Sequence, residues 1–142
     1  MLKLVLDTNT FIAAYFNRKS ASARIIDLCL KKKHKLIFSS RLSKEVRLIL
    51  NNVRAEKKFL KKVRSLFMNA SKVEPTQEVF AVKEDPEDNK FLECALEGKA
   101  DYLITSDRHL LGLGEFAQTK ICKPTQFLKL QYRGGDPSWR EK

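Results

Sequence analysis

Four carboxylates lie far apart in the sequence but could meet at one place in the fold: Asp7, Glu45, Asp88 and Asp107. If they come within several ångströms of one another, each raises the pKa of the others, and their repulsion destabilises the fold. A divalent cation would remove this conflict, and ligands that are all oxygen suit Mg²⁺ or Mn²⁺ better than zinc. The two histidines, His34 and His109, have no ligand spacing between them. The acids therefore point to a magnesium or manganese site.

Each acid also has a purely structural interpretation. Asp7 and Asp107 could cap the helices that follow them. Asp85 and Asp88 could form a local capping arrangement at the start of another helix. Glu45 lies in or beside the apolar stripe of its helix, so its charge needs a partner, which could be a lysine, an arginine or a shared metal. The residues alone leave these alternatives open.

The positions of the acids depend on the strands and helices that carry them. Leu2–Leu6 is a near-continuous apolar run, which is typical of a strand covered on both faces. Further strands are predicted at 35–38, 78–82, 101–105 and near 120–122. Helices are predicted at 8–16, 22–32, 40–53, 55–70, 85–98, 107–112 and from 124 onward. In the helix at 85–98, Asp85 is the expected cap, Pro86 the first helical residue and Gly98 the residue beyond the end.

Strands that alternate with helices predict an α/β fold with three layers, α/β/α, and a mostly parallel central sheet of about five strands. In such sheets the ligand site lies outside the carboxyl ends of the strands. Asp7 and Asp107 follow predicted strands closely, and Glu45 and Asp88 lie near the starts of helices that follow predicted strands. All four acids could thus converge at one edge of the sheet.

The composition fits one globular domain. The chain has 142 residues, of which 43% are hydrophobic and 32% charged, and it is too short to expect two domains. We assign residues 1–132 to this domain and residues 133–142 to a flexible C-terminal tail. Cys29, Cys94 and Cys122 are distant from one another and form no CxxC pair, as expected of reduced core cysteines in a cytoplasmic protein. Neither a secretory leader nor a membrane-spanning segment is expected.

The charge balance suggests a polyanionic partner. Lys and Arg number 28 against 17 Asp and Glu, which gives a formal net charge of +11. A surplus of this size is expected to attract RNA or DNA. Solubility alone is the other explanation, and composition does not exclude it.

Four sequence segments together resemble the PIN-domain nucleases. They are "LVLDTNTFI" near the start, "SSRLSKEV" in the middle, "EDPEDNKFLECALEGKADYLITSD" late in the chain, and "HLL" soon after. More narrowly, the chain resembles the VapC-like toxin components of bacterial and archaeal toxin–antitoxin pairs. The resemblance covers about residues 1–130. Single elements such as D-x-N are weak signals, whereas the ordered set of four acids is specific.

This resemblance implies a site and an activity. Asp7, Glu45, Asp88 and Asp107 match the family's acidic quartet around one or two Mg²⁺ or Mn²⁺ ions. Thr8, Asn9 and Ser106 match the polar residues that orient the quartet, and Asp85 matches an outer contributor. At Ser106 this subgroup often has glycine, so the chain departs from the pattern there.

The implied reaction is hydrolysis of RNA phosphodiester bonds, with a cognate antitoxin that occupies a basic groove and a homodimeric assembly. Basic residues that could form the RNA-binding rim are Arg18, Lys19, Arg41, Lys44, Lys90 and Arg108. The basic residues between 57 and 64 are assigned to a solvated helix face.

Two rival classes are weighed against this hypothesis. A haloacid-dehalogenase-like phosphatase would use Asp7 as a nucleophile in a D-x-D-x-T pattern, but "DTNT" has Asn9 where that chemistry needs a second acid. A non-catalytic RNA-binding or partner-binding module of the same fold is the second rival. The complete quartet argues against it.

Overall fold

A computed structural model of the chain describes residues 1–131. Its strands are β1 (Lys3–Leu6), β2 (Lys35–Phe38), β3 (Ser71–Lys72), β4 (Tyr102–Ile104), β5 (Glu115–Phe116) and β6 (Thr119–Cys122). Its α-helices are α1 (Thr8–Phe16), α2 (Ala21–Leu30), α3 (Ser40–Asn52), α4 (Lys57–Met68), α5 (Asn89–Gly98), α6 (Arg108–Leu111) and α7 (Pro124–Gln131). A short 3₁₀ helix, η1 (Pro86–Asp88), precedes α5. The tail assigned to residues 133–142 lies outside the described residues.

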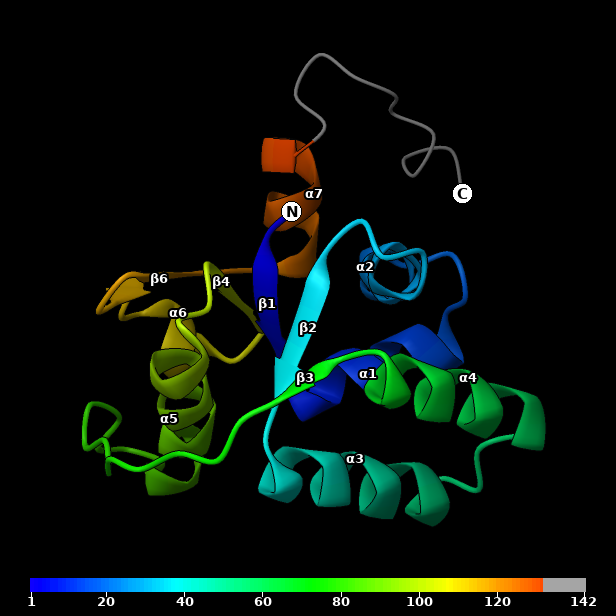
Figure 1. The fold of residues 1–142 in the computed structure, drawn as a ribbon, viewed down its shortest axis with the longest axis horizontal. Helices are drawn as coiled ribbons and strands as arrows, with labels where there is room; N and C mark the ends of the chain where they lie inside the picture. Colours follow the sequence, from blue (N-terminus) through cyan, green and yellow to red (C-terminus); the bar gives the residue numbers. More distant parts are fainter. Residues whose placement is uncertain (132–142) are drawn as a thin grey trace.

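The strands form one six-stranded sheet in the order β3-β2-β1-β4-β6-β5 (Figure 1). Neighbouring strands are parallel except β5 and β6, which are antiparallel. The mostly parallel α/β sheet is therefore confirmed. β1 lies between β2 and β4, so the carboxyl ends of these three strands share one edge.

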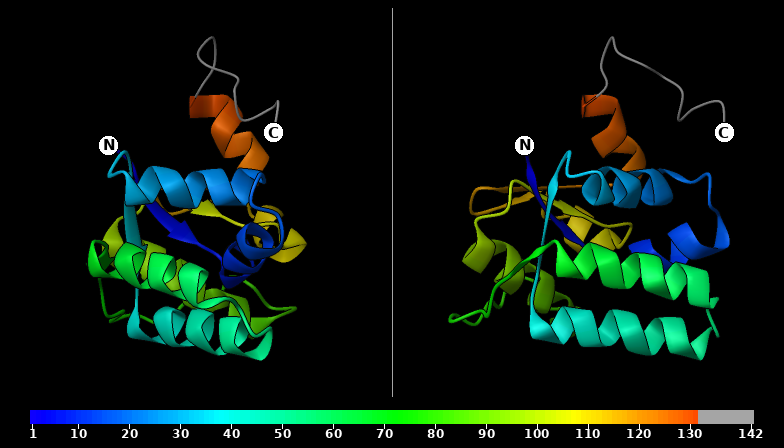
Figure 2. Two further views of the ribbon diagram at one scale, coloured as in Figure 1. Left: turned by 90° about the vertical axis from the view of Figure 1, so that its right-hand side faces the viewer. Right: turned by 45° about the vertical axis from the view of Figure 1, so that its right-hand side comes forward.

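Side chains that alternate along the strands build two hydrophobic cores, one on each face of the sheet. On β1, Leu4 and Leu6 belong to the core covered by α1, α2 and α4, whereas Val5 belongs to the core covered by α5. On β4, Leu103 and Ile104 divide in the same way. Figures 1 and 2 show these helices on opposite sides of the sheet. The predicted three-layer arrangement is present.

The strand predicted at 78–82 is wrong. This segment has no strand pairing, although Val79 and Val82 are buried. Their backbone N–H groups donate to side chains of α5 instead: Val79 to Glu93 Oε2 at 3.0 Å and Val82 to Asn89 Oδ1 at 2.8 Å. The two valines are buried as predicted strand residues would be, but side chains satisfy the backbone that a neighbouring strand would otherwise pair. The strand in this part of the chain is the two-residue β3.

The predicted end of the helix at 85–98 is also wrong. Gly98 is the last residue of α5, and the left-handed cap conformation is taken by Lys99, with φ of 51°. A Cβ atom on Gly98 would lie 2.4 Å from Cγ2 of Ile37 on β2. The glycine therefore allows a close approach of α5 to the sheet rather than ending the helix.

The three cysteines are free and buried, as the sequence predicted. Burial raises the pKa of Cys29 to about 12 and that of Cys122 to about 11. It also raises the pKa of Cys94 to about 12, with a smaller contribution from Glu74. Separately, none of the helices within residues 1–131 is long and apolar enough to span a membrane.

Gly98→Ala is expected to destabilise the fold. Helix propensity alone favours alanine by about 1 kcal/mol, but overpacking against Ile37 costs about 1–3 kcal/mol, and the second effect should dominate. Urea denaturation of Gly98→Ala, Ile37→Ala and the double variant measures the coupling between the two positions. The double variant should lose less stability than the sum of the single losses, and strict additivity would show that the contact is not the cause.

Candidate metal centre

Asp7 lies at the carboxyl end of β1 and is 4% exposed. Its Oδ1 accepts a hydrogen bond from the backbone N–H of Asn9 at 3.0 Å, so it does cap α1. Its Oδ2 accepts a second hydrogen bond, at 2.6 Å, from Oγ1 of Thr105. The cap uses one oxygen only, and the other faces the end of β4.

Asp107 is linked to Asp7 through Thr105. The Thr105 hydroxyl accepts from the backbone N–H of Asp107 at 3.0 Å while it donates to Asp7. Asp107 Oδ1 in turn accepts from the N–H of His109 at 2.7 Å and caps α6. Thr105 is fully buried and connects the ends of β4 and β1. Its role was not predicted from the sequence, although a threonine that closes an apolar strand beside a candidate acid was the available signal.

Asp88 is the carboxylate in the least favourable surroundings. It ends η1, is 8% exposed, and its Oδ2 has no hydrogen-bond partner among the described residues. Unlike Asp85, which accepts from the N–H of Glu87, it makes no side-chain capping bond. Burial raises the pKa of Asp88 to about 6, with further contributions from the charges of Asp107, Asp85 and Asp7 and from a side-chain hydrogen bond with Asp107. A capping role therefore does not explain Asp88.

Because Asp107, Asp85 and Asp7 all contribute to the raised pKa of Asp88, the fold holds these carboxylates near one another. Within residues 1–131, no group of three or more His, Cys, Asp or Glu side chains already has a geometry that could hold a metal ion. The chemistry of the donors nevertheless fits a hard cation, because they are carboxylate oxygens and one of them is buried without a partner. Binding would require these side chains to draw closer.

Glu45 has a different environment from the three aspartates. Both of its carboxylate oxygens lie 2.8 Å from Nζ of Lys90, and Arg41 Nε lies 3.8 Å from Oε1. The Lys90 side chain is only 13% exposed, so this ion pair is well shielded. Of the partners that the sequence allowed for Glu45, a lysine occupies the position in the structure.

The three polar residues expected to support the site differ in burial and in their contacts with Asp7. Thr8 is buried, and its hydroxyl lies 3.5 Å from Asp7 Oδ1. Asn9 is exposed and contributes its backbone N–H to Asp7. Ser106 is exposed between two residues of the site, Thr105 and Asp107. The threonine one position earlier makes the contacts expected of a supporting hydroxyl.

The six basic residues expected at the rim divide into two groups. Arg18 pairs with Glu56 at 3.9 Å and lies over the Tyr15 ring. Arg41 also binds Glu87, and Lys90 binds Glu45. The other three are exposed and form no ion pair within the described part of the chain: Lys19, Lys44 and Arg108. This second group has no ion pair to give up when it meets a polyanion.

Comparison with known proteins identifies the family. A family model described as "PIN domain" matches residues 3–109, which include all four acids. The chain belongs to the PIN domain family. PIN domains are generally nucleases and typically use divalent metals.

This PIN domain is also similar to an uncharacterized protein of Methanocaldococcus jannaschii, MJ1680. The two are 33% identical over 121 residues, which cover 79% of this chain and 75% of that protein. No solved structure matches the chain. Family membership agrees with the acid cluster at the carboxyl ends of β1 and β4, where an α/β sheet binds its ligands.

Asp88 should make the metal-free PIN domain less stable as the pH rises. Its pKa is about 6 in the fold against an ordinary value of 3.8, so the folded state binds more protons between these values. Stability from this group is therefore present near pH 4 and lost as the pH passes 6, a change of about 3 kcal/mol. Asp88→Asn should remove this dependence and unfold at higher urea than the parent at pH 7 in chelator. Glu78→Gln changes an exposed acid and should keep the parental dependence of stability on pH. If Asp88→Asn shows the same pH dependence as the parent, Asp88 is not its cause.

Thr105→Val tests the bridge between the two strand ends. Valine keeps the shape but leaves Asp7 Oδ2 and the Asp107 N–H without their shared partner, at a cost of about 1–3 kcal/mol. Thr119→Val is the matched control, because that buried hydroxyl makes one bond, to the carbonyl of Ala100 at 2.7 Å. Urea denaturation should show the larger loss at Thr105. Equal losses would mean that the bridge adds nothing beyond one ordinary hydrogen bond.

Proposed function

We propose that this PIN domain is a ribonuclease that depends on Mg²⁺ or Mn²⁺ and hydrolyses RNA phosphodiester bonds. The observation that carries the proposal is the buried, unpartnered Oδ2 of Asp88, coupled electrostatically to Asp7 and Asp107. A structural carboxylate is normally paired, because an isolated buried charge is costly. An unpaired one among other acids is expected where a cation binds.

Each residue of the cluster has a distinct part in the proposal. Asp7, Asp88 and Asp107 would hold the metal ion. The bound ion would lower the pKa of a water molecule attached to it and would neutralise negative charge on the phosphate. Thr105 fixes the Asp7 carboxylate and the backbone of Asp107. Glu45 is the fourth carboxylate of the proposed set. Because Lys90 already neutralises it, we assign it a smaller contribution to metal binding.

RNA as the substrate is supported by charge. The net charge of +11 attracts a phosphate backbone, and an acidic pocket needs nearby cations to admit phosphates. Arg108 directly follows Asp107 and is exposed, so it is a candidate for contact with the phosphates. Lys19 and Lys44 are the other exposed candidates that form no ion pair within residues 1–131.

The biological role that we propose is that of the toxin in a toxin–antitoxin pair, acting in the cytoplasm as a homodimer. This part of the proposal rests on the VapC-like motifs of the sequence. It requires a small antitoxin gene beside the gene for this chain, and growth arrest on expression of the chain alone. An isolated gene whose expression leaves growth unaffected would contradict the toxin role but not the ribonuclease activity.

Asp7→Asn and Asp88→Asn are expected to abolish RNA cleavage in Mg²⁺ or Mn²⁺ while the fold survives. Each variant removes a charged oxygen ligand and keeps the side-chain shape. Glu45→Gln should retain measurable cleavage, because Glu45 is paired with Lys90, and Glu78→Gln should match the parent. Cleavage of labelled RNA, circular dichroism and calorimetric titration with Mn²⁺ provide the measurements.

Two results would contradict the proposal. The first is a parent protein that cuts no RNA with either metal, together with Asn variants that bind Mn²⁺ as well as the parent. The second is turnover of small phosphate esters with phosphorylation of Asp7, which would favour the phosphatase alternative. Binding of RNA without cleavage in either metal would favour the non-catalytic module.

A further inference from the structure

Lys90, near the start of α5, is the basic residue closest in sequence to Asp88, and a carboxylate of another helix holds it. Its Nζ atom lies 2.8 Å from Oε1 and 2.8 Å from Oε2 of Glu45 on α3. The side chain of Lys90 is 13% exposed and that of Glu45 26%, so water screens the pair only in part. The ammonium also lies 5.2 Å from the centroid of the Phe91 ring. Lys90 is therefore a shielded charge with a fixed partner.

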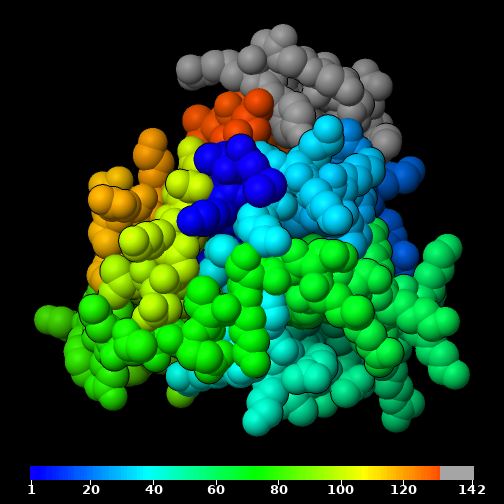
Figure 3. All heavy atoms as spheres, viewed as in Figure 1, coloured from blue at the N-terminus to red at the C-terminus, as the bar shows by residue number. Residues whose placement is uncertain are grey.

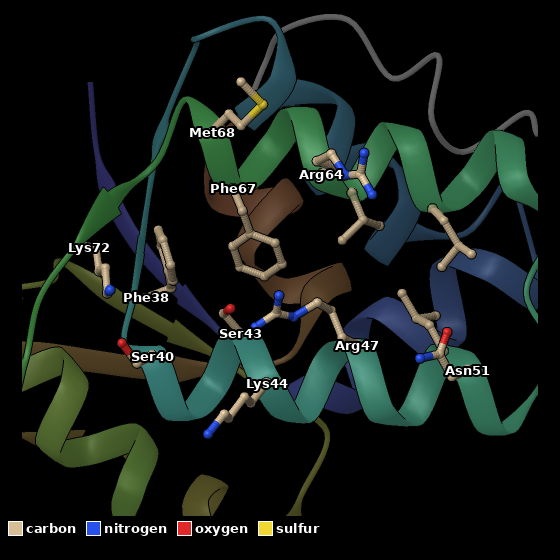
Figure 4. Close-up of a pocket in the computed structure, with 13 residues that line it drawn as sticks. Phe38, Ser40, Ser43, Lys44, Arg47, Asn51, Arg64, Phe67, Met68 and Lys72 are labelled. Carbon is tan, nitrogen blue, oxygen red and sulfur yellow. The ribbon is translucent and has the colours of Figure 1, made fainter.

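Glu45 lies on the side of α3 that faces away from α4. Residues two positions apart in a helix point about 200° apart, so Glu45 lies opposite Ser43 and Arg47. Those two residues line an open groove of about 760 Å³ between α3 and α4, and Figure 4 shows them on the side of α3 toward α4. In the space-filling view, α3 and α4 lie next to each other on the face toward the viewer (Figure 3). Thus α4 covers one side of α3, and Lys90 meets Glu45 on another.

Lys90 and Glu45 are each other's nearest ionic partners within residues 1–131. Arg41 Nε lies 3.8 Å from Glu45 Oε1, and Arg41 also binds the exposed Glu87. Lys90 Nζ lies 3.9 Å from Glu87 Oε2, much farther than from either oxygen of Glu45. Because one ammonium contacts both Glu45 oxygens, a metal ion could bind this carboxylate only by displacing Lys90.

We propose that Lys90 withholds Glu45 from the metal ion and thereby sets the affinity of the candidate metal centre. The inference rests on the proposed function, because it assumes that the three aspartates hold a divalent cation. Lys90 follows Asp88 by two residues, so the ion pair holds the Glu45 carboxylate at the end of α5 where Asp88 lies.

The number of charged ligands is what Lys90 controls. The affinity of a site for a hard cation depends on how many charged oxygens it offers. While Lys90 occupies both Glu45 oxygens, the aspartates are the carboxylates available to the ion. Without the ammonium, Glu45 becomes available as a further ligand. Lys90 is thus a positioning residue that acts through Glu45.

Two other roles for Lys90 give different results in the same experiment. A positive charge near an acid cluster lowers cation affinity through space, whether or not Glu45 is present. A lysine at the RNA-binding rim, where the sequence predicted Lys90, would affect the binding of RNA and not of the metal. An ammonium already paired with Glu45 has less to offer a phosphate.

The test is calorimetric titration with Mn²⁺, without RNA, of the parent, Lys90→Gln, Glu45→Gln and the double variant. Lys90→Arg keeps the charge. Lys83→Gln is the matched control, because Lys83 is an exposed lysine shortly before Asp85 that forms no ion pair within the described part of the chain. Circular dichroism checks each fold. If Lys90→Gln does not fold, Lys90→Met replaces it, since methionine fills similar space beside Phe91 without a charge.

The affinity for Mn²⁺ should rise about tenfold in Lys90→Gln, a size typical of changes to residues that contact a metal ligand. Lys90→Arg should bind like the parent, and Lys83→Gln should change little. The double variant should lose the rise, because the effect passes through Glu45. Glu45→Gln alone should bind Mn²⁺ about as tightly as the parent.

The inference is overturned if Lys90→Gln leaves the Mn²⁺ affinity unchanged or lowers it. It is also overturned if the double variant keeps the rise, which would show an effect of charge through space. In both cases the proposed metal centre still stands if the parent binds Mn²⁺ and Asp88→Asn does not. If neither the parent nor any variant binds Mn²⁺, the metal centre of the proposed function fails together with the inference.

Discussion

Repulsion among Asp7, Asp88 and Asp107, of which Asp7 and Asp88 are buried, is the constraint on which the site in this structure depends. The parallel sheet places Asp7 and Asp107 at one edge because their strands are neighbours, and η1 brings Asp88 beside them. Nothing in the described residues pairs with Asp88 Oδ2. The fold accepts this arrangement because two well-packed cores, one on each face of the sheet, hold the strand ends in place. The unpaired carboxylate lowers the stability of the fold at this site, as is common at binding sites.

The surrounding charges are organised around the same constraint. Arg41, Glu45, Glu87 and Lys90 form a network of ion pairs at the start of α5. This network leaves Glu45 neutralised, whereas the three aspartates have no basic partner among the described residues. The contrast separates acids that are satisfied within the fold from acids that await a cation. Whether a residue is Asp or Glu, and where it lies in a motif, does not show whether its charge is paired within the fold.

Much of the architecture could be predicted from the sequence because strand and helix periodicities are strong in this chain. The strand predicted at Leu2–Leu6 begins one residue later in the structure, and the strand predicted at 35–38 has the predicted bounds. The strand at 78–82 was wrong because apolar residues do not reveal what the backbone pairs with, and here side chains of α5 supply the partners. Gly98 was predicted to lie beyond the helix end because glycine is common there, but glycine also occurs where two elements pack closely. The contact with Ile37 depends on tertiary packing.

The acids of the candidate site could be predicted from the sequence, but the hydrogen bonds and ion pairs that link them to other residues could not. Acids near strand ends can be found from the sequence, whereas the bridge made by Thr105 and the pairing of Glu45 with Lys90 depend on side-chain geometry. Ser106 was chosen over Thr105 because a motif gives positions, and only the fold shows which hydroxyl is buried. Similarly, Arg18 and Arg108 look equivalent in a sequence, but only one of them is engaged with an aromatic ring.

The buried cysteines have a practical consequence for the study of this protein. Thiols react as thiolates, and a pKa of about 12 leaves on the order of one thiolate in 10⁵ at neutral pH. Burial further denies reagents access to Cys29, Cys94 and Cys122. The three native thiols of the folded chain are therefore expected to react slowly with thiol reagents. A single cysteine introduced on the surface would accept a maleimide dye or spin label selectively, without prior removal of the native thiols.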